Sequence, residues 1–307
     1  MAHYLVTGGA GFIGSHLIAA LVGRGDKVRV LDDLSTGRRD NLPPSVPLIV
    51  GDVADAVAVR EAMAGVDGCF HLAAVASVER GNEDWLGTHR ANLTGAIAVF
   101  DAARTAKTPV VYASSAAVYG DNPAPGLTET APPAPLSAYG ADKLGCELHA
   151  TIAFQVHGVP TTGFRFFNVY GPRQDPGSPY SGVIAIFAGQ ITRGAPITIF
   201  GDGQQVRDFI YVGDVVAHLL AAIDRAPARH EVYNVCTGRE TSVRHLAQVI
   251  AGLKGAAPTI THAPERAGDI RRSLGDPAKA VAAFGLRAQV PLEDGLRLTL
   301  DWMADSA

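Results

Sequence analysis

The sequence places a tyrosine and a lysine at helical spacing, some distance after a serine. Tyr139 and Lys143 lie in the run Tyr-Gly-Ala-Asp-Lys, and Ser115 precedes them in Ser-Ser-Ala-Ala-Val-Tyr-Gly. Residues four apart share one face of a helix, so the lysine ammonium would favour the phenolate form of the tyrosine. With a serine hydroxyl beside them, these groups could take a proton from an alcohol while hydride leaves its carbon. That chemistry requires a hydride acceptor, which the three residues cannot supply.

The N-terminal segment carries the signal for such an acceptor. An apolar strand expected over His3–Thr7 runs into the turn Gly-Gly-Ala-Gly-Phe-Ile-Gly and then into a segment with helical periodicity. Glycines at 8, 11 and 14 permit a tight turn, close backbone approach to a pyrophosphate, and a helix N-terminus aimed at negative charge. The next strand, 27–31, ends at Asp32 and Asp33, where an acid would meet ribose hydroxyls. The order predicts a dinucleotide site; the alternative is a glycine-rich turn in another α/β protein.

The acid at position 32 favours NAD over NADP, because a carboxylate would repel the 2′-phosphate. Arg38 and Arg39 follow closely and weaken that preference. A third strand, 47–50, is followed by Asp52, which we interpret as an adenine contact. The alternative for this aspartate is a helix cap, the commoner role of an acid at a strand end.

Length and composition agree with a globular enzyme. The chain has 307 residues, of which 47% are hydrophobic and 18% are charged, enough for one large domain or two unequal ones. With 26 basic and 30 acidic residues, the net charge of −4 argues against a nucleic-acid partner. No apolar run reaches the length of a membrane span, and no leader is recognised, so we expect no membrane partner and a cytoplasmic location. The three cysteines and ten histidines have no metal-ligand spacing, and we predict no metal site.

Strands and helices alternate through residues 1–167, which predicts a doubly wound parallel Rossmann sheet in the α/β class. From 168 onward the alternation loosens, and we expect residues 168–307 to form mainly a smaller mixed α/β substrate domain. Residues 208–236 are expected to return to the first domain. The expected helices are 54–63, 85–106, Ala138–His157, 183–193 and 215–224; the later strands are 68–73, 110–114, Thr161–Phe166, 208–212 and 232–236.

Several motifs recur together over essentially the whole chain. They are Thr-Gly-Gly-Ala-Gly-Phe-Ile-Gly at 7–14, the serine and Tyr-x-x-x-Lys segments, Arg-Phe-Phe-Asn-Val-Tyr-Gly-Pro at 165–172, Val-Arg-Asp-Phe-Ile-Tyr-Val at 206–212, and Glu-Arg-Ala-Gly-Asp at 265–269. With these motifs the chain resembles the extended short-chain dehydrogenase/reductases that modify nucleotide sugars. Within that group it is most similar to UDP-glucose 4-epimerases and their bacterial UDP-hexose relatives.

The resemblance implies a catalytic set of Ser115, Tyr139 and Lys143, and an NAD that stays tightly bound through the cycle. The implied cofactor contacts are Gly8, Gly11, Phe12, Ile13, Gly14, Asp32, Asp33, Asp52, Val53, Leu72, Ala73, Ala74, Asn92, Tyr139, Lys143 and Phe166. The implied substrate contacts are Ser115, Asn168, Phe200, Arg207, Arg266 and Ser273. Two arginines on one pyrophosphate would give bidentate, charge-assisted hydrogen bonds, whereas Phe200 either flanks the uracil or packs in a core.

The residues after Ser115 decide the chemistry that the resemblance implies. Dehydratases of this group carry an Asp-Glu pair there and the uronate decarboxylases usually a Glu, but this chain has Ala116 and Ala117. Neither alanine can transfer a proton, so redox chemistry at C4 of the sugar remains. We therefore expect an NAD-dependent 4-epimerase of UDP-glucose and UDP-galactose. Ser273, where a small side chain admits an N-acetyl group, suggests use of the N-acetyl forms as well; the alternative is that it faces solvent.

Two other readings stay open at this point. One is another enzyme of the same scaffold, either a uronate or pentose 4-epimerase or a UDP-sugar 4-dehydrogenase. The other is a sensor that binds NAD or a UDP-sugar without turnover. The helices 85–106 and Ala138–His157 carry small and apolar residues on more than one face. Relatives pair these helices into an intermolecular four-helix bundle, so a homodimer is expected; the alternative is that the second apolar face packs within the chain.

Overall fold

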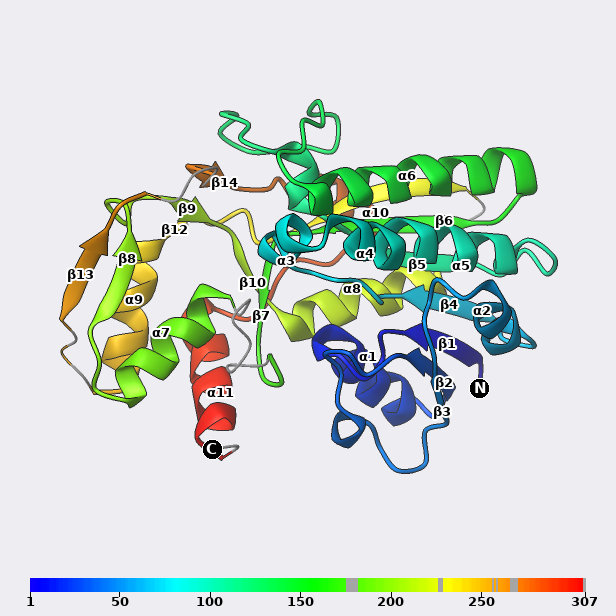
Figure 1. Ribbon diagram of the computed structural model, residues 1–307, viewed down its shortest axis with the longest axis horizontal. Helices are drawn as coiled ribbons and strands as arrows, with labels where there is room; N and C mark the ends of the chain where they lie inside the picture. The colour runs from blue at the N-terminus through cyan, green and yellow to red at the C-terminus, as the bar shows by residue number, and fades with distance from the viewer. Residues whose placement is uncertain (175–181, 226–228, 256, 258, 266–269, 306–307) are drawn as a thin grey trace.

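In the computed structural model, a seven-stranded parallel sheet forms the larger of two lobes (Figure 1). Its strand order, β11-β6-β5-β4-β1-β2-β3, places the switch point between β1 and β4, as in a doubly wound sheet. The structure describes residues 1–174, 182–225, 229–255, 257, 259–265 and 270–305. The strands are β1 (His3–Thr7), β2 (Lys27–Asp32), β3 (Leu48–Val50), β4 (Gly68–His71), β5 (Val110–Ser115), β6 (Thr161–Phe166) and β11 (His230–Val235).

The strands of this sheet are continuous apolar runs because both of its faces are buried. Along β1, Val6 packs into one core with Leu17, whereas the neighbouring Leu5 packs into the opposite core with Val99. Each such side chain stabilises the fold by about 1.5–3 kcal/mol on full burial. One core is closed by α1 (Phe12–Gly23), α8 (Val212–Asp224) and α10 (Ala278–Phe284), the other by α2 (Ala56–Met63), α5 (Gly95–Ala103) and α6 (Ala138–His157).

The second lobe is built around its own core, between a two-stranded sheet and three helices (Figure 1). Phe187, Leu246 and Leu296 bring α7, α9 and α11 together in that core. Short strand pairs link the lobe to the large sheet. The elements are β7 (Asn168–Tyr170), α7 (Val183–Thr192), β8 (Ile197–Phe200), β9 (Val206–Arg207), β10 (Phe209–Tyr211), β12 (Thr241–Ser242), α9 (Val243–Leu253), β13 (Ile260–Ala263), β14 (Arg272–Ser273) and α11 (Leu292–Asp305). The predicted fold class, a doubly wound α/β sheet with a smaller mixed region, is confirmed.

The helix expected over 85–106 is divided by a stretch of wider helical winding. It consists of α4 (Trp85–His89), the π-helical turn η2 (Arg90–Thr94) and α5, and a short helix, α3 (Val78–Glu83), precedes it. This wider turn carries Asn92, a buried asparagine whose side chain bonds to Val75 in the loop after β4. α5 ends at Ala103, three residues earlier than expected, and the turn that follows reaches Lys107, which has a left-handed φ of 51°.

The segment 208–236 departs from the expectation in one element. β11 joins the large sheet beside β6, and α8 packs on α1. The strand expected over 208–212, however, pairs as β10 with β7 outside that sheet. The backbone N–H of Asn168 donates to the carbonyl of Asp208 at 2.9 Å and begins this pairing. The tight connection also starts α8 at Val212, three residues earlier than expected.

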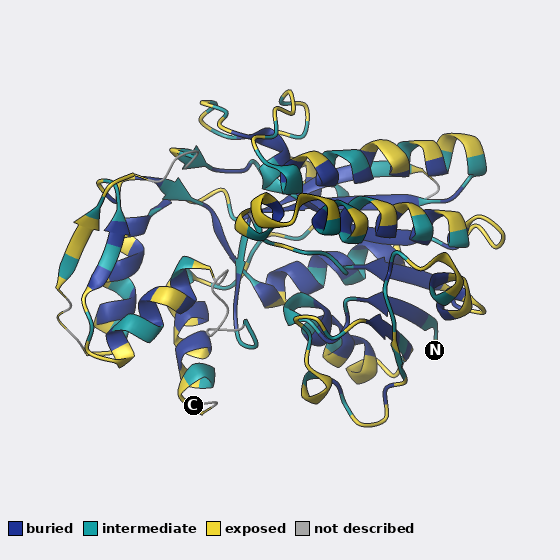
Figure 2. Cartoon of the chain, viewed as in Figure 1, coloured by how far each residue is buried: buried dark blue, intermediate teal, exposed yellow. Residues whose placement is uncertain are grey.

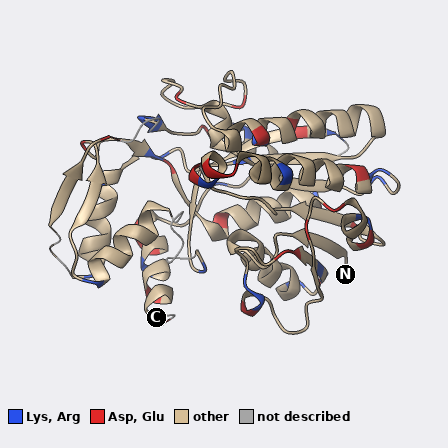
Figure 3. Cartoon of the chain, viewed as in Figure 1, with Lys and Arg blue, Asp and Glu red and all other residues tan. Residues whose placement is uncertain are grey.

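The surface carries charged residues of both signs and an apolar stripe on α6. Figure 2 shows buried strands beneath helices α5 and α6, whose outer faces are exposed. Basic residues (Lys, Arg) and acidic residues (Asp, Glu) are interspersed along the described part of the chain (Figure 3). Among those residues, no helix is both long and apolar enough to cross a bilayer. On α6, Leu148, Ile152 and Val156 lie one turn apart and are about half exposed or more.

Candidate active site

A cavity of about 400 Å³ lies at the carboxyl edge of the large sheet. Its lining comes from the turn after β1, the residues that end or follow β2 to β4, the end of β5, and the residues around the end of β6. The carboxyl ends of parallel strands meet at one edge, and ligands bind there at the switch point of doubly wound sheets. The first turns of α6 close the cavity on one side.

The glycine turn between β1 and α1 is so tight that a Cβ does not fit at Gly8, its first residue, or at Gly14 in the first turn of α1. A Cβ on Gly14 would lie 2.3 Å from the carbonyl oxygen of Gly8. Gly8 has φ of 68°, and a Cβ there would lie 2.6 Å from the backbone nitrogen of Ala73. Within the described part of the chain, no side chain caps the first turn of α1. The N–H groups of that turn are therefore free for an anionic ligand such as a pyrophosphate.

Asp32 is held at the end of β2 by two backbone amides. Its Oδ2 accepts the N–H of Ala10 and its Oδ1 that of Leu34, both at 2.9 Å. Burial raises the pKa of Asp32, and the two amides oppose that shift. Each carboxylate oxygen keeps a second lone pair for a ribose hydroxyl. Arg38 and Arg39, which left NADP open, are not in the cavity lining.

Ser115, Tyr139 and Lys143 all line this cavity. Lys143 is buried, and its ammonium donates to the carbonyl of Ala113 at 3.0 Å. Ala113 directly precedes the two serines that end β5. The same nitrogen lies 5.9 Å from the centre of the Tyr139 ring. The structure thus brings the phenol, the ammonium and the serine hydroxyl to the same cavity as the glycine turn. This arrangement can transfer a proton next to a bound hydride acceptor.

Gly140 determines how closely α6 approaches the serine-bearing segment. A Cβ on Gly140 would lie 2.7 Å from the carbonyl oxygen of Ala117. Ala117 belongs to the 3-10 turn η3 (Ala116–Tyr119), and its N–H donates to Ser115 Oγ at 3.1 Å. The sequence reading used Gly140 only as a spacer before Lys143. The local pattern holds no sign of this contact, because it depends on where the helix docks.

His71 lies beneath the cavity, where it joins the ends of β1 and β4. Its Nδ1 and the hydroxyl of Thr7 are 2.8 Å apart, and the two residues are paired in register. Burial, with a smaller contribution from the charge of Lys143, lowers the pKa of His71 to about 3. The imidazole is therefore neutral at ordinary pH, so it adds no second positive charge beside Lys143.

Asn92 is the one predicted cofactor contact that is absent from the cavity lining. It is fully buried in η2, where its Oδ1 accepts the N–H of Val75 at 2.8 Å. Its Nδ2 donates to the carbonyl of the same residue at 3.2 Å. Val75 and Ala91 line the cavity themselves. Asn92 therefore holds the segment after β4 in place from behind.

Asp52 lies in the cavity lining, together with Val53. The alternative role of helix cap belongs to another residue, because Asp55 accepts the first N–H groups of α2. Asp52 Oδ1 accepts the N–H of Ala54 at 2.8 Å, and its Oδ2 pairs with Arg90 at 3.0 Å. Its position at the cavity is compatible with the expected adenine contact.

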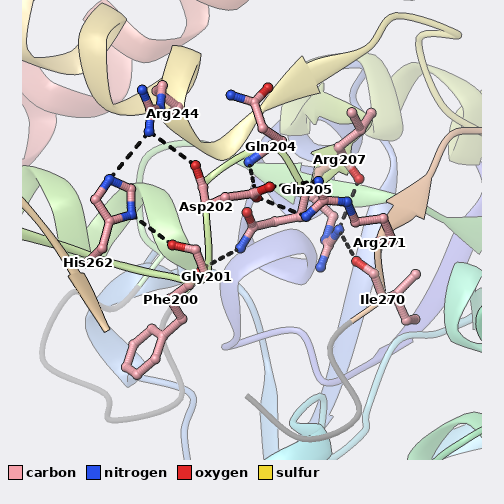
Figure 4. Close-up of polar contacts among 11 residues, drawn as sticks. Phe200, Gly201, Asp202, Gln204, Gln205, Arg207, Arg244, His262, Ile270 and Arg271 are labelled. Atoms are coloured by element: carbon pink, nitrogen blue, oxygen red, sulfur yellow. Dashed lines mark hydrogen bonds and ion pairs between the residues drawn. The ribbon is translucent and has the colours of Figure 1, made fainter. Parts of the chain in front are cut away.

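Three residues expected to hold the substrate, Phe200, Arg207 and Ser273, lie on the short strands β8, β9 and β14, and Figure 4 shows the first two. Arg207 on β9 and Ser273 on β14 are register partners in adjacent strands. The Arg207 guanidinium donates to the carbonyls of Val206 at 2.9 Å and Ile270 at 2.6 Å. Phe200 ends β8, and its ring points away from the polar contacts drawn around it (Figure 4). None of these residues lines the cavity described above.

Asn168 connects this region to the large sheet, since its Nδ2 donates to the carbonyl of Asp208 at 3.2 Å. Asp208 is fully buried and accepts the N–H and hydroxyl of Thr237, at 2.8 and 2.7 Å. Its other oxygen accepts the N–H of Gly238 at 2.9 Å. In the sequence, Asp208 is noticeable only as the residue after Arg207, an expected ligand of the substrate diphosphate. Arg266, the second expected phosphate ligand, lies outside the described residues.

Known proteins are similar to this chain over nearly its full length. A family model for the NAD dependent epimerase/dehydratase family matches residues 4–236. A UDP-glucose 4-epimerase of Mycolicibacterium smegmatis is 37% identical, over 99% of both chains. A UDP-N-acetyl-alpha-D-glucosaminuronate decarboxylase of Bacillus cytotoxicus is 32% identical, over 98% of this chain and 97% of its own.

Two solved structures give the same picture. The Thermus thermophilus UDP-glucose 4-epimerase in complex with NAD superposes with a TM-score of 0.92 and 38% identity, over 99% of this chain and 100% of its own. The UDP-N-acetylglucosamine 4-epimerase of Methanobrevibacter ruminantium, in complex with UDP-N-acetylmuramic acid, gives 0.95 and 34%, over 100% and 99%. The glycine cradle and Asp32 fit NAD. The chain therefore belongs to the NAD dependent epimerase/dehydratase family, within the extended short-chain dehydrogenase/reductases, and NAD is its cofactor.

Proposed function

We propose that this protein is an NAD-dependent 4-epimerase of UDP-hexoses, which interconverts UDP-glucose and UDP-galactose. One observation carries the proposal: Ser115, Tyr139 and Lys143 line the cavity of the glycine turn, while Ala116 and Ala117 beside them can neither give nor take a proton. A dehydratase or a decarboxylase of this scaffold would need a further acid or base there. Relatives named as UDP-glucose 4-epimerases support the same reaction.

In the proposed mechanism, Tyr139 is the acid–base group. Its phenolate takes the proton of the sugar 4-hydroxyl, and Ser115 supports that hydroxyl by a hydrogen bond. Bound NAD supplies the hydride chemistry, as acceptor and then donor at C4. Lys143 is fixed by the carbonyl of Ala113 and stabilises the phenolate. After the keto sugar has rotated to present its other face, Tyr139 returns the proton. A proton transfer of this kind typically contributes about 10²- to 10⁴-fold in rate.

Rotation of the keto sugar within the site requires that the substrate be held by its diphosphate. We assign this to Asn168, Arg207 and Arg266, because charged donors on a phosphate leave the sugar free to rotate. The position of Ser273 opposite Arg207 supports a place for this small side chain in the sugar pocket. We propose on that basis that N-acetylated UDP-hexoses are also substrates, and the similarity to the Methanobrevibacter UDP-N-acetylglucosamine 4-epimerase supports this.

An equilibrium assay without added NAD tests the proposal. Purified enzyme with UDP-galactose is expected to give UDP-glucose with no net NADH absorbance, because the cofactor is regenerated. The same assay is run with UDP-GlcNAc, UDP-glucuronate and UDP-xylose. Net NADH release identifies a 4-dehydrogenase, carbon dioxide from a uronate identifies a decarboxylase, and exclusive turnover of a uronate or pentose identifies the other epimerases. Binding of these UDP-sugars without turnover of any of them would indicate a sensor, not an enzyme.

We also propose a homodimer through α5 and α6. The exposed stripe of Leu148, Ile152 and Val156 runs along α6, and Ile97 on α5 is 37% exposed. Apolar side chains at one-turn spacing on a helix exterior are suited to helix–helix packing with a second copy. A monomeric mass by light scattering at micromolar concentration contradicts this assembly. The cytoplasmic location expected from the sequence stays part of the proposal, and cell fractionation tests it.

A further inference from the structure

We propose that the buried ion pair of Glu147 and Arg165 positions the catalytic groups, and that Ser114 couples the pair to the cavity. All three residues are at most 6% exposed. Ser114 lines the cavity, whereas the ion pair lies behind it. The inference rests on the proposed epimerase function, because it concerns the geometry of the same catalytic groups.

The helix α6 presents three functional side chains in sequence along one face. Tyr139, Lys143 and Glu147 are each four residues apart, so they lie on one side of the helix. Lys143 donates to the carbonyl of Ala113, and the hydroxyl of Ser114 donates to Glu147 Oε1 at 2.5 Å. Two successive residues of β5 are thus bonded to two successive turns of α6. These two bonds fix the helix against the strand that ends at the catalytic serine.

Arg165 holds the carboxylate of Glu147 from the neighbouring strand. Its Nε donates to Oε1 at 2.8 Å and its Nη2 to Oε2 at 2.7 Å, a bidentate pairing. On β6, Arg165 is the register partner of Ser114, so both side chains reach Glu147 from adjacent strands. A bidentate contact restricts both distance and orientation, which a single hydrogen bond does not.

The guanidinium of Arg165 also packs on the turn that follows Ser115. The Arg165 carbon Cζ lies 4.8 Å from the ring centre of Tyr119, the last residue of η3. The Tyr119 hydroxyl donates to Asn234 Oδ1 at 2.6 Å, which fixes the ring on β11. Arg165 is therefore packed between the helix that carries Tyr139 and the turn that begins at Ser115. It links the two segments whose separation the reaction depends on.

A buried ion pair is a poor device for stability alone, because desolvation of both charges offsets most of their attraction. Its advantage is a defined geometry, and displacement of a catalytic group by about 1 Å can reduce the rate about 100-fold. We therefore assign Glu147 and Arg165 as positioning residues: neither lines the cavity, and both act through α6 and η3.

The test compares Glu147→Asp, Ser114→Ala and Arg165→Lys with Asp214→Asn. Glu147→Asp keeps the charge but withdraws the carboxylate by about 1.5 Å, the length of one carbon–carbon bond. Asp214 is a matched control, because it is also buried and accepts two hydrogen bonds, from the N–H groups of Gln289 and Val290. It lies on α8, which packs on α1 across the sheet from α6. Each protein is measured for kcat, KM, NAD content and thermal unfolding.

We expect Glu147→Asp and Arg165→Lys to lower kcat by about 10- to 100-fold, with KM and NAD content near the wild-type values. Ser114→Ala should lower kcat less, and the acid limb of the kcat profile should move to higher pH in all three, because the phenolate is less well supported. Asp214→Asn should lower stability and leave kcat unchanged. A purely structural role of the pair predicts the opposite: reduced stability with wild-type kcat per folded, NAD-loaded molecule, which would overturn the proposal.

Amide hydrogen exchange separates failure of this inference from failure of the proposed function. If the wild type turned over no UDP-sugar, the epimerase proposal would fail before any variant was compared. Faster exchange at residues 138–143 in Glu147→Asp, but not in Asp214→Asn, would still support positioning by the pair. Equal exchange in both proteins would contradict it, whatever the activity.

Discussion

Gly14→Ala is the sharpest test of the cofactor cradle. The added Cβ would lie 2.3 Å from the carbonyl oxygen of Gly8 and 2.7 Å from the Cα of Gly9. Ordinary contact begins at 3.4 Å, so the turn must open by 3.4 − 2.3 = 1.1 Å, and both neighbours are backbone atoms that cannot swing aside. Overpacking of this kind costs about 1–3 kcal/mol. Since 1.4 kcal/mol corresponds to a factor of ten, NAD affinity should fall by about 5- to 150-fold if the whole cost opposes binding.

The assay uses Gly23→Ala as its control, because Gly23 is the last residue of the same helix and a Cβ there meets no atom within 4 Å. In that open position alanine should be neutral or stabilising by up to about 1 kcal/mol. NAD released on denaturation, NAD titration and thermal unfolding with and without NAD are measured for both variants. A Gly14→Ala protein with wild-type NAD affinity and wild-type unfolding temperature would refute the steric reasoning.

Three further predictions concern the catalytic group, the substrate pocket and the assembly. Tyr139→Phe should keep NAD and UDP-sugar binding and lower kcat by about 10²- to 10⁴-fold; near-normal turnover would exclude Tyr139 as the acid–base group. Ser273→Tyr should abolish turnover of UDP-GlcNAc and spare UDP-glucose, whereas unchanged use of both would remove Ser273 from the sugar pocket. Ile152→Glu should convert the proposed dimer to a monomer by light scattering with the circular dichroism unchanged, because a charge in the apolar α6 stripe would be buried without a partner against a second copy. A dimer that survives this change places the interface elsewhere.

The cofactor half of the site could be read from local patterns. The glycine turn, the acid after the second strand and the Tyr139–Lys143 spacing each lie within one short segment or one helix face. The α/β alternation then places the strand ends at a common edge, so the cavity at the end of β1 and Ser115 was predictable from order alone. The cavity lining includes the predicted catalytic set and the predicted cofactor contacts other than Asn92.

The polar contacts across elements could not be read in this way. The Asn92 amide reaches Val75 from η2, a turn that is wound more widely than an α-helix. Glu147 lies four residues after Lys143, a spacing that was a usable signal, but its partners Ser114 and Arg165 come from other elements. Arg207 and Ser273 are far apart in sequence and become neighbours through a two-residue strand pairing.

The sequence by itself determined the fold class and the cofactor, and it predicted the proton-transferring residues. These follow from hydrophobic periodicity and turn chemistry, which act over a few residues and are written locally in the chain. Tertiary structure alone decided which polar side chains support the site from behind. That choice depends on the register between β5 and β6 and on the docking of α6, which bring Ser114, Arg165 and Glu147 together. Docking is set by the sum of many packing contacts, so no single segment of the sequence encodes it.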